Sequence, residues 1–133
     1  MGRTHKKVSD PPPGAPPGGW TPESAAIAVK KALSVIEGRW KLLILFQLFD
    51  GKVRRFSELE RAIPAVTQKM LAQQLRQLEK DGIVLRTIYP EVPPRVEYAL
   101  TESGQGLCPV LDSLLRWAAE RPRDPADEMR SES

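Results

Sequence analysis

The sequence predicts a mainly α-helical domain with a small β-hairpin, and three observations support this prediction. Apolar residues recur at helical spacing in five separate stretches. Residues 83–100 are instead rich in β-branched and aromatic residues, as strands are. From residue 55 to residue 100 the predicted order is a short helix, a turn, a longer helix and a hairpin. This is the order of a winged helix-turn-helix.

The length of 133 residues suits one domain, and both ends of the chain read differently from its middle. We expect residues 1–20 to be a disordered arm, because a basic cluster is followed there by a proline and glycine run that cannot pack a core. An arm that touches DNA phosphates is the alternative. The folded domain is predicted over residues 21–120, and residues 121–133 are predicted to be a flexible tail.

Composition limits the compartment. No apolar run approaches the roughly 20 residues that a membrane-spanning helix needs, and the first residues lack the apolar core of a signal peptide. The single cysteine, Cys108, cannot form a disulfide within the chain, which agrees with a reducing environment. We therefore expect a cytoplasmic protein without membrane association.

The distribution of charge is more informative than the net charge of +3. Between Lys52 and Arg95 the chain carries nine basic and five acidic residues, so the positive excess lies within the predicted helix-turn-helix and hairpin. Such an excess favours a nucleic-acid partner. An ordinary solvated surface of mixed charge is the alternative.

Two helices are predicted before the helix-turn-helix. Thr21 followed by Pro22 is typical of a helix start, and the apolar spacing continues over about Pro22 to Glu37. Residues 40–49 are apolar nearly all round and end at an Asp-Gly pair, which predicts a buried helix at the centre of the core.

Capping signals mark the two helices of the predicted helix-turn-helix. Ser57 and Glu60 fit a capping box for a short helix that Pro64 ends. Thr67 fits the N-cap of the longer helix, and Gly82 fits its C-terminal cap. The predicted buried face of the longer helix consists of three leucines at helical spacing: Leu71, Leu75 and Leu78.

A hairpin and a last helix complete the domain. The strands are predicted over Ile83 to Tyr89 and Arg95 to Leu100, with proline-rich residues 90–94 at the tip. Thr101 is predicted to cap a helix over about Glu102 to Glu120. The apolar surface of that helix is broader than one contact needs.

The longer helix of the pair has the residues of a DNA-recognition helix over about residues 68–81. A major groove admits one α-helix, in which glutamine can pair with adenine, and lysine or arginine with guanine. We predict base contacts from Gln68, Lys69 and Gln73. Base or phosphate contacts are predicted from Arg76 and Gln77, and a phosphate contact from Thr67 and the free N–H groups at the helix start. An ordinary solvent-facing helix is the alternative.

Basic residues outside this helix extend the predicted DNA surface. The wing, about residues 83–100, carries Arg95 near its tip, where it can enter a minor groove or bind phosphate. A weak ion pair with Glu91 or Glu97 is the alternative for Arg95. We expect one of Arg54 and Arg55 to contact phosphate. Charges that merely protect a strand edge are the alternative there.

Five stretches of the chain carry a resemblance to a known family. They are residues 38–45 (GRWKLLIL), 55–59 (RFSEL), 62–64 (AIP), 68–71 (QKML) and 89–98 (YPEVPPRVEY). Over about residues 25–118 the chain closely resembles the HxlR-type transcriptional regulators, which are related to the MarR group. The resemblance implies a bacterial homodimer that binds a pseudo-palindromic operator and pairs through its first and last helices. The apolar residues expected at that interface are Ile27, Leu33, Leu107, Leu111, Leu114 and Trp117.

The chain departs from the family at one informative place. Family members commonly carry a Cys-Pro pair thirteen and twelve residues before the tryptophan that here is Trp40, and in some that cysteine senses oxidants. Ile27 and Ala28 occupy these positions, so a thiol switch at this place is excluded. We expect Cys108 to be a small buried core or interface residue rather than a sensor.

The same sequence also bears on other functions and ligands. Trp40, Phe46 and Trp117 are candidates for the pocket of a small-molecule effector, with plain core residues as the alternative. A winged helix that binds another protein and no DNA is the alternative function. An enzyme is disfavoured, because the single histidine lies in the arm and no metal-ligand spacing, glycine-rich phosphate loop or nucleophile elbow occurs. No metal or cofactor is expected.

Overall fold

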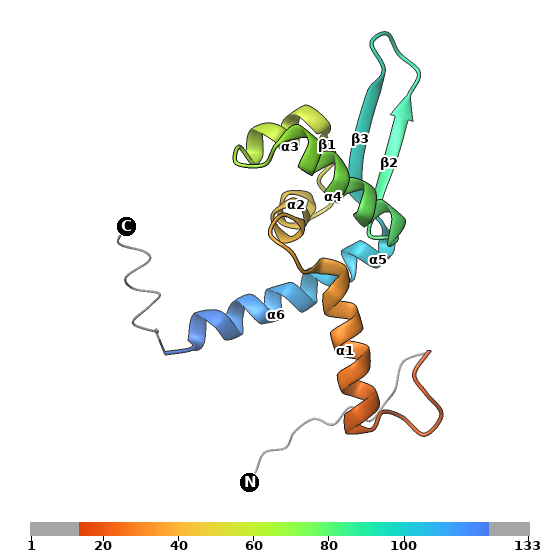
Figure 1. Cartoon of the computed structure of the whole chain (residues 1–133), viewed down its shortest axis with the longest axis vertical. Helices are drawn as coiled ribbons and strands as arrows, with labels where there is room; N and C mark the ends of the chain where they lie inside the picture. The colour runs from red at the N-terminus through yellow and green to blue at the C-terminus, as the bar shows by residue number, and fades with distance from the viewer. Residues whose placement is uncertain (1–13, 123–133) are drawn as a thin grey trace. The chain divides into compact units, whose positions relative to one another are not determined.

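The computed structural model describes residues 14–122. The chain divides into two compact units, Met1–Arg39 and Trp40–Ser133. Residues 14–20 and 121–122 carry no helix or strand. The rest of the predicted arm and tail lies outside the described residues. Figure 1 shows the order of the helices and strands along the chain.

The first unit consists of helix α1, Pro22–Ile36. The Thr21 hydroxyl accepts the N–H of Ser24 at 3.0 Å, and the Ser24 hydroxyl accepts the N–H of Thr21 at 2.9 Å. The predicted start, with Pro22 in the first turn, is therefore confirmed. The helix exposes large apolar side chains, among them Ile27, Val29 and Leu33.

Helix α2, Lys41–Leu48, lies at the centre of the second unit and packs against α3, α4 and β3. Ile44, Leu45 and Leu48 have no exposed surface, as the prediction of a core helix requires. The apolar residues of α2 are not all buried, because Leu43 is 47% exposed and Phe46 is 39% exposed. A helix whose neighbours lie on one side leaves its other side open.

Helix α3, Phe56–Ala62, begins two residues earlier than the sequence predicted. The Glu58 carboxylate accepts the backbone N–H of Arg55 at 2.7 Å, so the acidic cap involves Arg55 and Glu58 rather than Ser57 and Glu60. The chain passes directly from a paired strand into this helix, and the strand therefore fixes where the first turn starts.

Helix α4, Gln68–Lys80, follows after a short turn and matches its prediction closely. The Thr67 hydroxyl accepts the N–H of Met70 at 3.0 Å, which confirms the N-cap. The three leucines that were predicted to face inward are buried, with at most 1% exposure: Leu71, Leu75 and Leu78.

The end of α4 is closed by a tight turn at Gly82, which has a φ of 77°. The N–H of Gly82 donates to the carbonyl of Glu79 at 3.0 Å, and that of Ile83 donates to the carbonyl of Leu78 at 2.9 Å. These two bonds form a Schellman motif and confirm the role predicted for Gly82.

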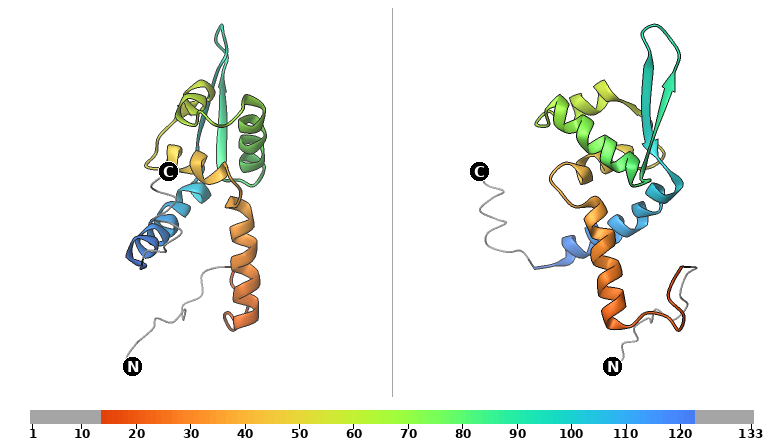
Figure 2. Two further views of the ribbon diagram at one scale, coloured as in Figure 1. Left: turned by 60° about the vertical axis from the view of Figure 1, so that its left-hand side comes forward. Right: turned by 45° about the vertical axis from the view of Figure 1, so that its right-hand side comes forward.

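The strands β1 (Arg54–Arg55), β2 (Val84–Tyr89) and β3 (Arg95–Leu100) form an antiparallel sheet in the order β1-β3-β2. The predicted hairpin is confirmed, and Figures 1 and 2 show it extending beyond the helices as a narrow wing. The sequence indicates a strand edge at Arg54 and Arg55 only as the alternative to a phosphate contact, because two arginines carry no alternating pattern, and β1 is such an edge strand. Its residues pair with Tyr98 and Glu97 of β3.

The predicted last helix is divided into α5, Glu102–Gln105, and α6, Leu107–Glu120. Pro109 has no N–H to donate to the carbonyl of Gln105, so the helical hydrogen-bond ladder is interrupted at Gly106. The Thr101 hydroxyl caps α5 by accepting the N–H of Gly104 at 3.0 Å, as predicted. No helix within residues 14–122 combines the length and apolarity that crossing a bilayer requires.

Candidate nucleic-acid interface

The side of α4 opposite its leucines is exposed and polar. Its exposed residues are all long hydrogen-bonding side chains: Gln68, Lys69, Gln73, Arg76, Gln77 and Lys80. In the described part of the chain, the three predicted base-contact residues, Gln68, Lys69 and Gln73, make no side-chain hydrogen bond or ion pair. Their donors and acceptors are therefore open to a ligand.

Two of the other predicted contacts in this region already have partners. The side-chain amide of Gln77 donates to the carboxylate of Asp81 at 3.2 and 3.3 Å, which holds it at the end of α4 away from the start. The Thr67 hydroxyl oxygen accepts the N–H of Met70, and its O–H is still available to donate a hydrogen bond to a phosphate oxygen.

The wing arginine, Arg95, is engaged within the wing itself. Its guanidinium lies 3.0 Å from the Glu91 carboxylate and 3.2 Å from that of Glu97. It also stacks on the ring of Tyr89, 4.0 Å from the ring centre. The ion-pair alternative predicted for Arg95 is therefore present in the structure, with both carboxylates. These contacts fix the side chain across the base of the wing tip.

Arg54 and Arg55 differ in how far they are available. The Arg54 Nε donates to the carbonyl of Gln47 at 3.3 Å, and the side chain is half-buried. Arg55 uses its backbone in β1 and in the cap of α3, and its residue is exposed. Of the two, Arg55 is the better placed for a phosphate contact.

A cluster that the sequence did not predict lies between α4 and the sheet. Its cavity of about 360 Å³ is lined by Ala72, Arg76, Glu79, Arg86 and Tyr98. Of these, only Arg76 was predicted as a site residue. The register that pairs Arg86 with Tyr98 is what brings the others together. The strand prediction alone could have placed Arg86 on the face of Tyr98, but not beside α4.

The residues predicted for a dimer interface separate into two groups. Ile27, Leu33, Leu114 and Trp117 are all at least 47% exposed and can contact a partner. Leu107 is half-buried, whereas Leu111 is 4% exposed and belongs to the core of the single chain. Leu111 is the one residue of α6 that the fold itself covers.

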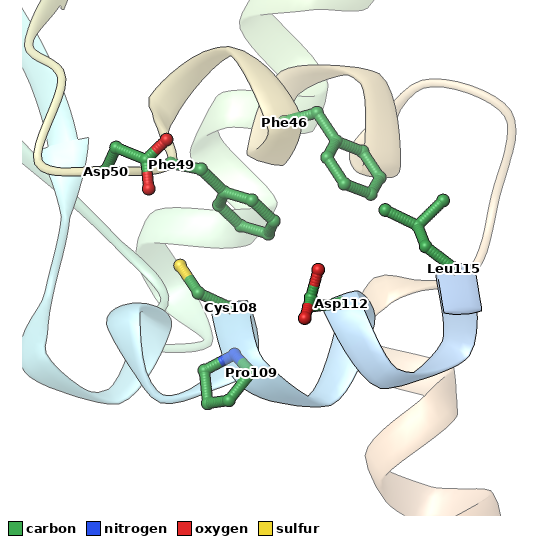
Figure 3. A pocket seen from close by; sticks show the side chains of 7 residues that line it. All are labelled: Phe46, Phe49, Asp50, Cys108, Pro109, Asp112 and Leu115. Atoms are coloured by element: carbon green, nitrogen blue, oxygen red, sulfur yellow. The ribbon is translucent and has the colours of Figure 1, made fainter. Parts of the chain in front are cut away.

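The predicted effector pocket is also rearranged. A cavity of about 430 Å³ between the end of α2 and α6 is lined by Phe46, Phe49, Asp50, Cys108, Pro109, Asp112 and Leu115 (Figure 3). The rings of Phe46 and Phe49 lie 4.9 Å apart. Trp40 and Trp117 do not line this cavity, and Trp117 is 61% exposed, with the Arg121 guanidinium 5.2 Å from its ring centre.

Cys108 is less buried than expected. It is half-buried and lines the cavity with the two phenylalanines, and its Sγ lies 4.0 Å from the side-chain oxygen of Gln105. No described lysine, arginine or histidine pairs with it. Residues 14–122 also contain no cluster of side chains that could hold a metal ion.

Comparison with known proteins identifies close relatives of the chain. The model of the HxlR-like helix-turn-helix family matches residues 35–124. The HTH-type transcriptional regulator YtcD of Bacillus subtilis is 53% identical over 93 residues, which are 70% of this chain and 73% of the relative. A solved MarR-family transcriptional regulator from Enterococcus faecalis V583 is 45% identical with a TM-score of 0.67, covering 71% of this chain and 84% of that one. The reduced form of the transcriptional regulator YodB from B. subtilis is 37% identical with a TM-score of 0.65, covering 79% and 99%.

Proposed function

The chain belongs to the HxlR-like helix-turn-helix family of DNA-binding transcriptional regulators, and on that premise we propose that it binds a pseudo-palindromic operator as a homodimer. Each protomer places α4 in a major groove and its wing on the neighbouring minor groove or backbone. The exposed face of α4 supports this most directly, because Gln68, Lys69 and Gln73 are donors and acceptors without partners in the described structure.

Base recognition is assigned to the first two turns of α4. Gln68, Lys69 and Gln73 present side chains that can read adenine or guanine edges. Arg55, Arg76 and the N–H groups that follow Thr67 contact phosphates and fix the register of the helix on the duplex. Arg95 acts mainly by holding the wing in shape, since two carboxylates and the Tyr89 ring already surround its guanidinium.

The dimer is proposed to form through α1 and α6. Each of these helices exposes large apolar side chains that a monomer in water would leave unpaired. On α1 they include Ile27 and Leu33, and on α6 they include Leu114 and Trp117. A two-fold dimer would set its two α4 helices about 34 Å apart, one turn of DNA, so that both enter major grooves on one face.

Regulation by a small molecule is proposed at the cavity between α2 and α6. Phe46, from the original prediction, lines it together with Phe49 and Leu115, and this apolar lining suits a ligand with an aromatic or aliphatic body. The cavity lies between the core helix α2 and the proposed dimer helix α6.

We also place the protein in the cytoplasm, because a regulator has to reach chromosomal DNA.

A duplex-binding titration tests the proposal. We expect the purified protein to bind its own promoter region, with affinity that falls steeply as potassium chloride rises, because each neutralised phosphate releases counterions. An unrelated duplex of the same length should bind more weakly. Binding that is absent, or independent of salt, would contradict the proposal and favour the module that binds only protein.

A further inference from the structure

The flank of α4 that faces the wing forms a second polar surface, distinct from the face assigned to base recognition. Ala72, Arg76 and Glu79 follow one another at helical spacing along this flank. Arg86 on β2 and Tyr98 on β3 face them across the cavity of about 360 Å³. Helix α4 packs against β2, so the cavity is bounded by elements of a single unit.

The phenol of Tyr98 is the least exposed group in this cavity. Tyr98 is 8% exposed, yet its hydroxyl forms no hydrogen bond in the described part of the chain. Burial raises the pKa of this phenol above its usual value of 10.0, an effect that Arg86 partly offsets, so the group carries its proton at neutral pH. A hydroxyl that opens onto the cavity and has no protein partner is a donor available to an acceptor that enters it.

The charges around the cavity favour an anion. Arg76 and Arg86 contribute two positive charges and Glu79 one negative charge. The Glu79 carboxylate lies 3.4 Å from the Nε of Arg86, and both side chains are about 40% exposed, so the pair is weak and leaves the terminal nitrogens of Arg86 for another acceptor. Ala72 has no side chain beyond its Cβ, which keeps the cavity open.

We propose that Arg76, Arg86 and Tyr98 bind one phosphodiester group of the operator backbone in the cavity between α4 and the wing. The inference rests on the proposed function. When α4 lies in a major groove and the wing contacts the adjacent groove, the DNA strand that separates the two grooves passes along this flank. Two guanidinium groups and a hydroxyl supply the donors that a phosphate oxygen accepts.

Salt-dependent binding separates the charged contacts of this site from the neutral one. For the double variant Arg76→Gln/Arg86→Gln we expect the slope of log affinity against log salt to become less steep by about 0.9 for each phosphate lost, hence by about 1.8 for a dimer. The loss should be equal for the operator and for an unrelated duplex, because a backbone contact carries no base information. For Tyr98→Phe we expect about tenfold weaker binding with the slope unchanged, since the hydroxyl is uncharged.

Two further variants complete the experiment. Glu79→Gln removes the competing carboxylate and should tighten binding severalfold, which a fold-damaging change could not do. Arg116→Gln removes a guanidinium of α6 that is 75% exposed and paired only with Asp112 in the described chain, and it should leave the slope as in the wild type.

The outcomes distinguish this site from the function on which it rests. Absence of duplex binding by the wild-type protein would overturn both. Salt-dependent binding by the wild type, together with unchanged slope in the double variant and unchanged affinity in Tyr98→Phe and Glu79→Gln, would overturn the phosphate site and leave the function standing. Thermal unfolding of each variant identifies any that fails to fold. If one does, Glu79→Gln decides whether the phosphate site exists, because it is expected to tighten DNA binding whereas the other variants are expected to weaken it.

Discussion

Helices α4 and α6 have nearly the same length, 13 and 14 residues, but present opposite chemistry to the solvent. Helix α4 buries three leucines and exposes amides and cations. Helix α6 fully buries only Leu111 and exposes four large apolar side chains: Val110, Leu114, Leu115 and Trp117. Figure 1 shows the wing and α6 at opposite ends of the second unit.

The difference indicates what each helix binds. Nucleic acid is recognised by polar side chains whose hydrogen-bonding groups are not yet used. A second protein chain is recognised by apolar surface that water solvates poorly. One short chain thus carries both kinds of surface, and each can be altered without touching the other.

The largest expected effect is on the buried side of α4. Leu75→Ala removes three carbons from a residue that is 1% exposed, and we expect the free energy of unfolding to fall by about 2–5 kcal/mol. Gln73→Ala, on the exposed side of the same helix, should change it by less than about 0.5 kcal/mol. Urea denaturation followed by circular dichroism measures both, and equal losses would contradict the assignment of faces.

A charge on the apolar side of α6 tests the proposed dimer. Leu114→Glu places a carboxylate where the structure exposes 47% of a leucine, and we expect the sedimentation mass to halve. Operator affinity should then fall about 100-fold, or roughly 2.7 kcal/mol, because a monomer contacts one half-site of the operator instead of two. Arg116→Gln is the matched control on the same helix. A dimer that persists in Leu114→Glu would show that the chains pair elsewhere.

The polar side of α4 is tested by base preference. Gln73→Ala should lower the discrimination between the preferred base pair and its alternatives by about 1–3 kcal/mol at one position of each half-site. Binding to an unrelated duplex should hardly change. Competition with single-base variants of the operator measures this, and preserved discrimination at every position would move the reading role to Gln68 or Lys69.

The smallest effect concerns how the two helices begin. Thr67 caps α4 through a hydrogen bond of 3.0 Å, whereas α6 starts at Gly106 without a side-chain cap. We expect Thr67→Ala to cost about 1 kcal/mol in the free energy of unfolding, and Gly106→Ser to cost less. Chemical denaturation of both variants and of the wild type measures these losses. A larger loss for Gly106→Ser than for Thr67→Ala would contradict the prediction.

Local signals in the sequence predicted most of the fold. Thr21, Thr67 and Thr101 each cap a helix as expected, and Gly82 closes α4, because these roles depend on a few neighbouring residues. Features that depend on contacts distant in sequence were missed. Strand β1 exists because Arg54 and Arg55 pair with β3, and that pairing moves the start of α3.

The candidate site follows the same division. The exposed face of α4 was predicted correctly, since helical periodicity alone decides it. The cavity of Arg86 and Tyr98 depends on strand register and on the packing of α4 against β2, which no local pattern contains. The sequence indicates Glu91 or Glu97 as an alternative partner of Arg95, but only the folded hairpin brings both carboxylates to its guanidinium.

The turn after α4 also determines how the molecule can move. Beyond the two backbone bonds that close the helix, the Thr101 hydroxyl donates to the carbonyl of Gly82 at 2.6 Å, and its N–H donates to that of Ile83 at 2.9 Å. A side chain at Gly104 would collide with the same Ile83 carbonyl. These contacts hold three segments together at one point: the end of α4, the start of β2 and the start of α5. Helix α4 and the wing are thus held in a fixed relative position. In the proposed dimer, an effector would therefore act by changing the spacing of the two protomers rather than by bending α4 away from its wing.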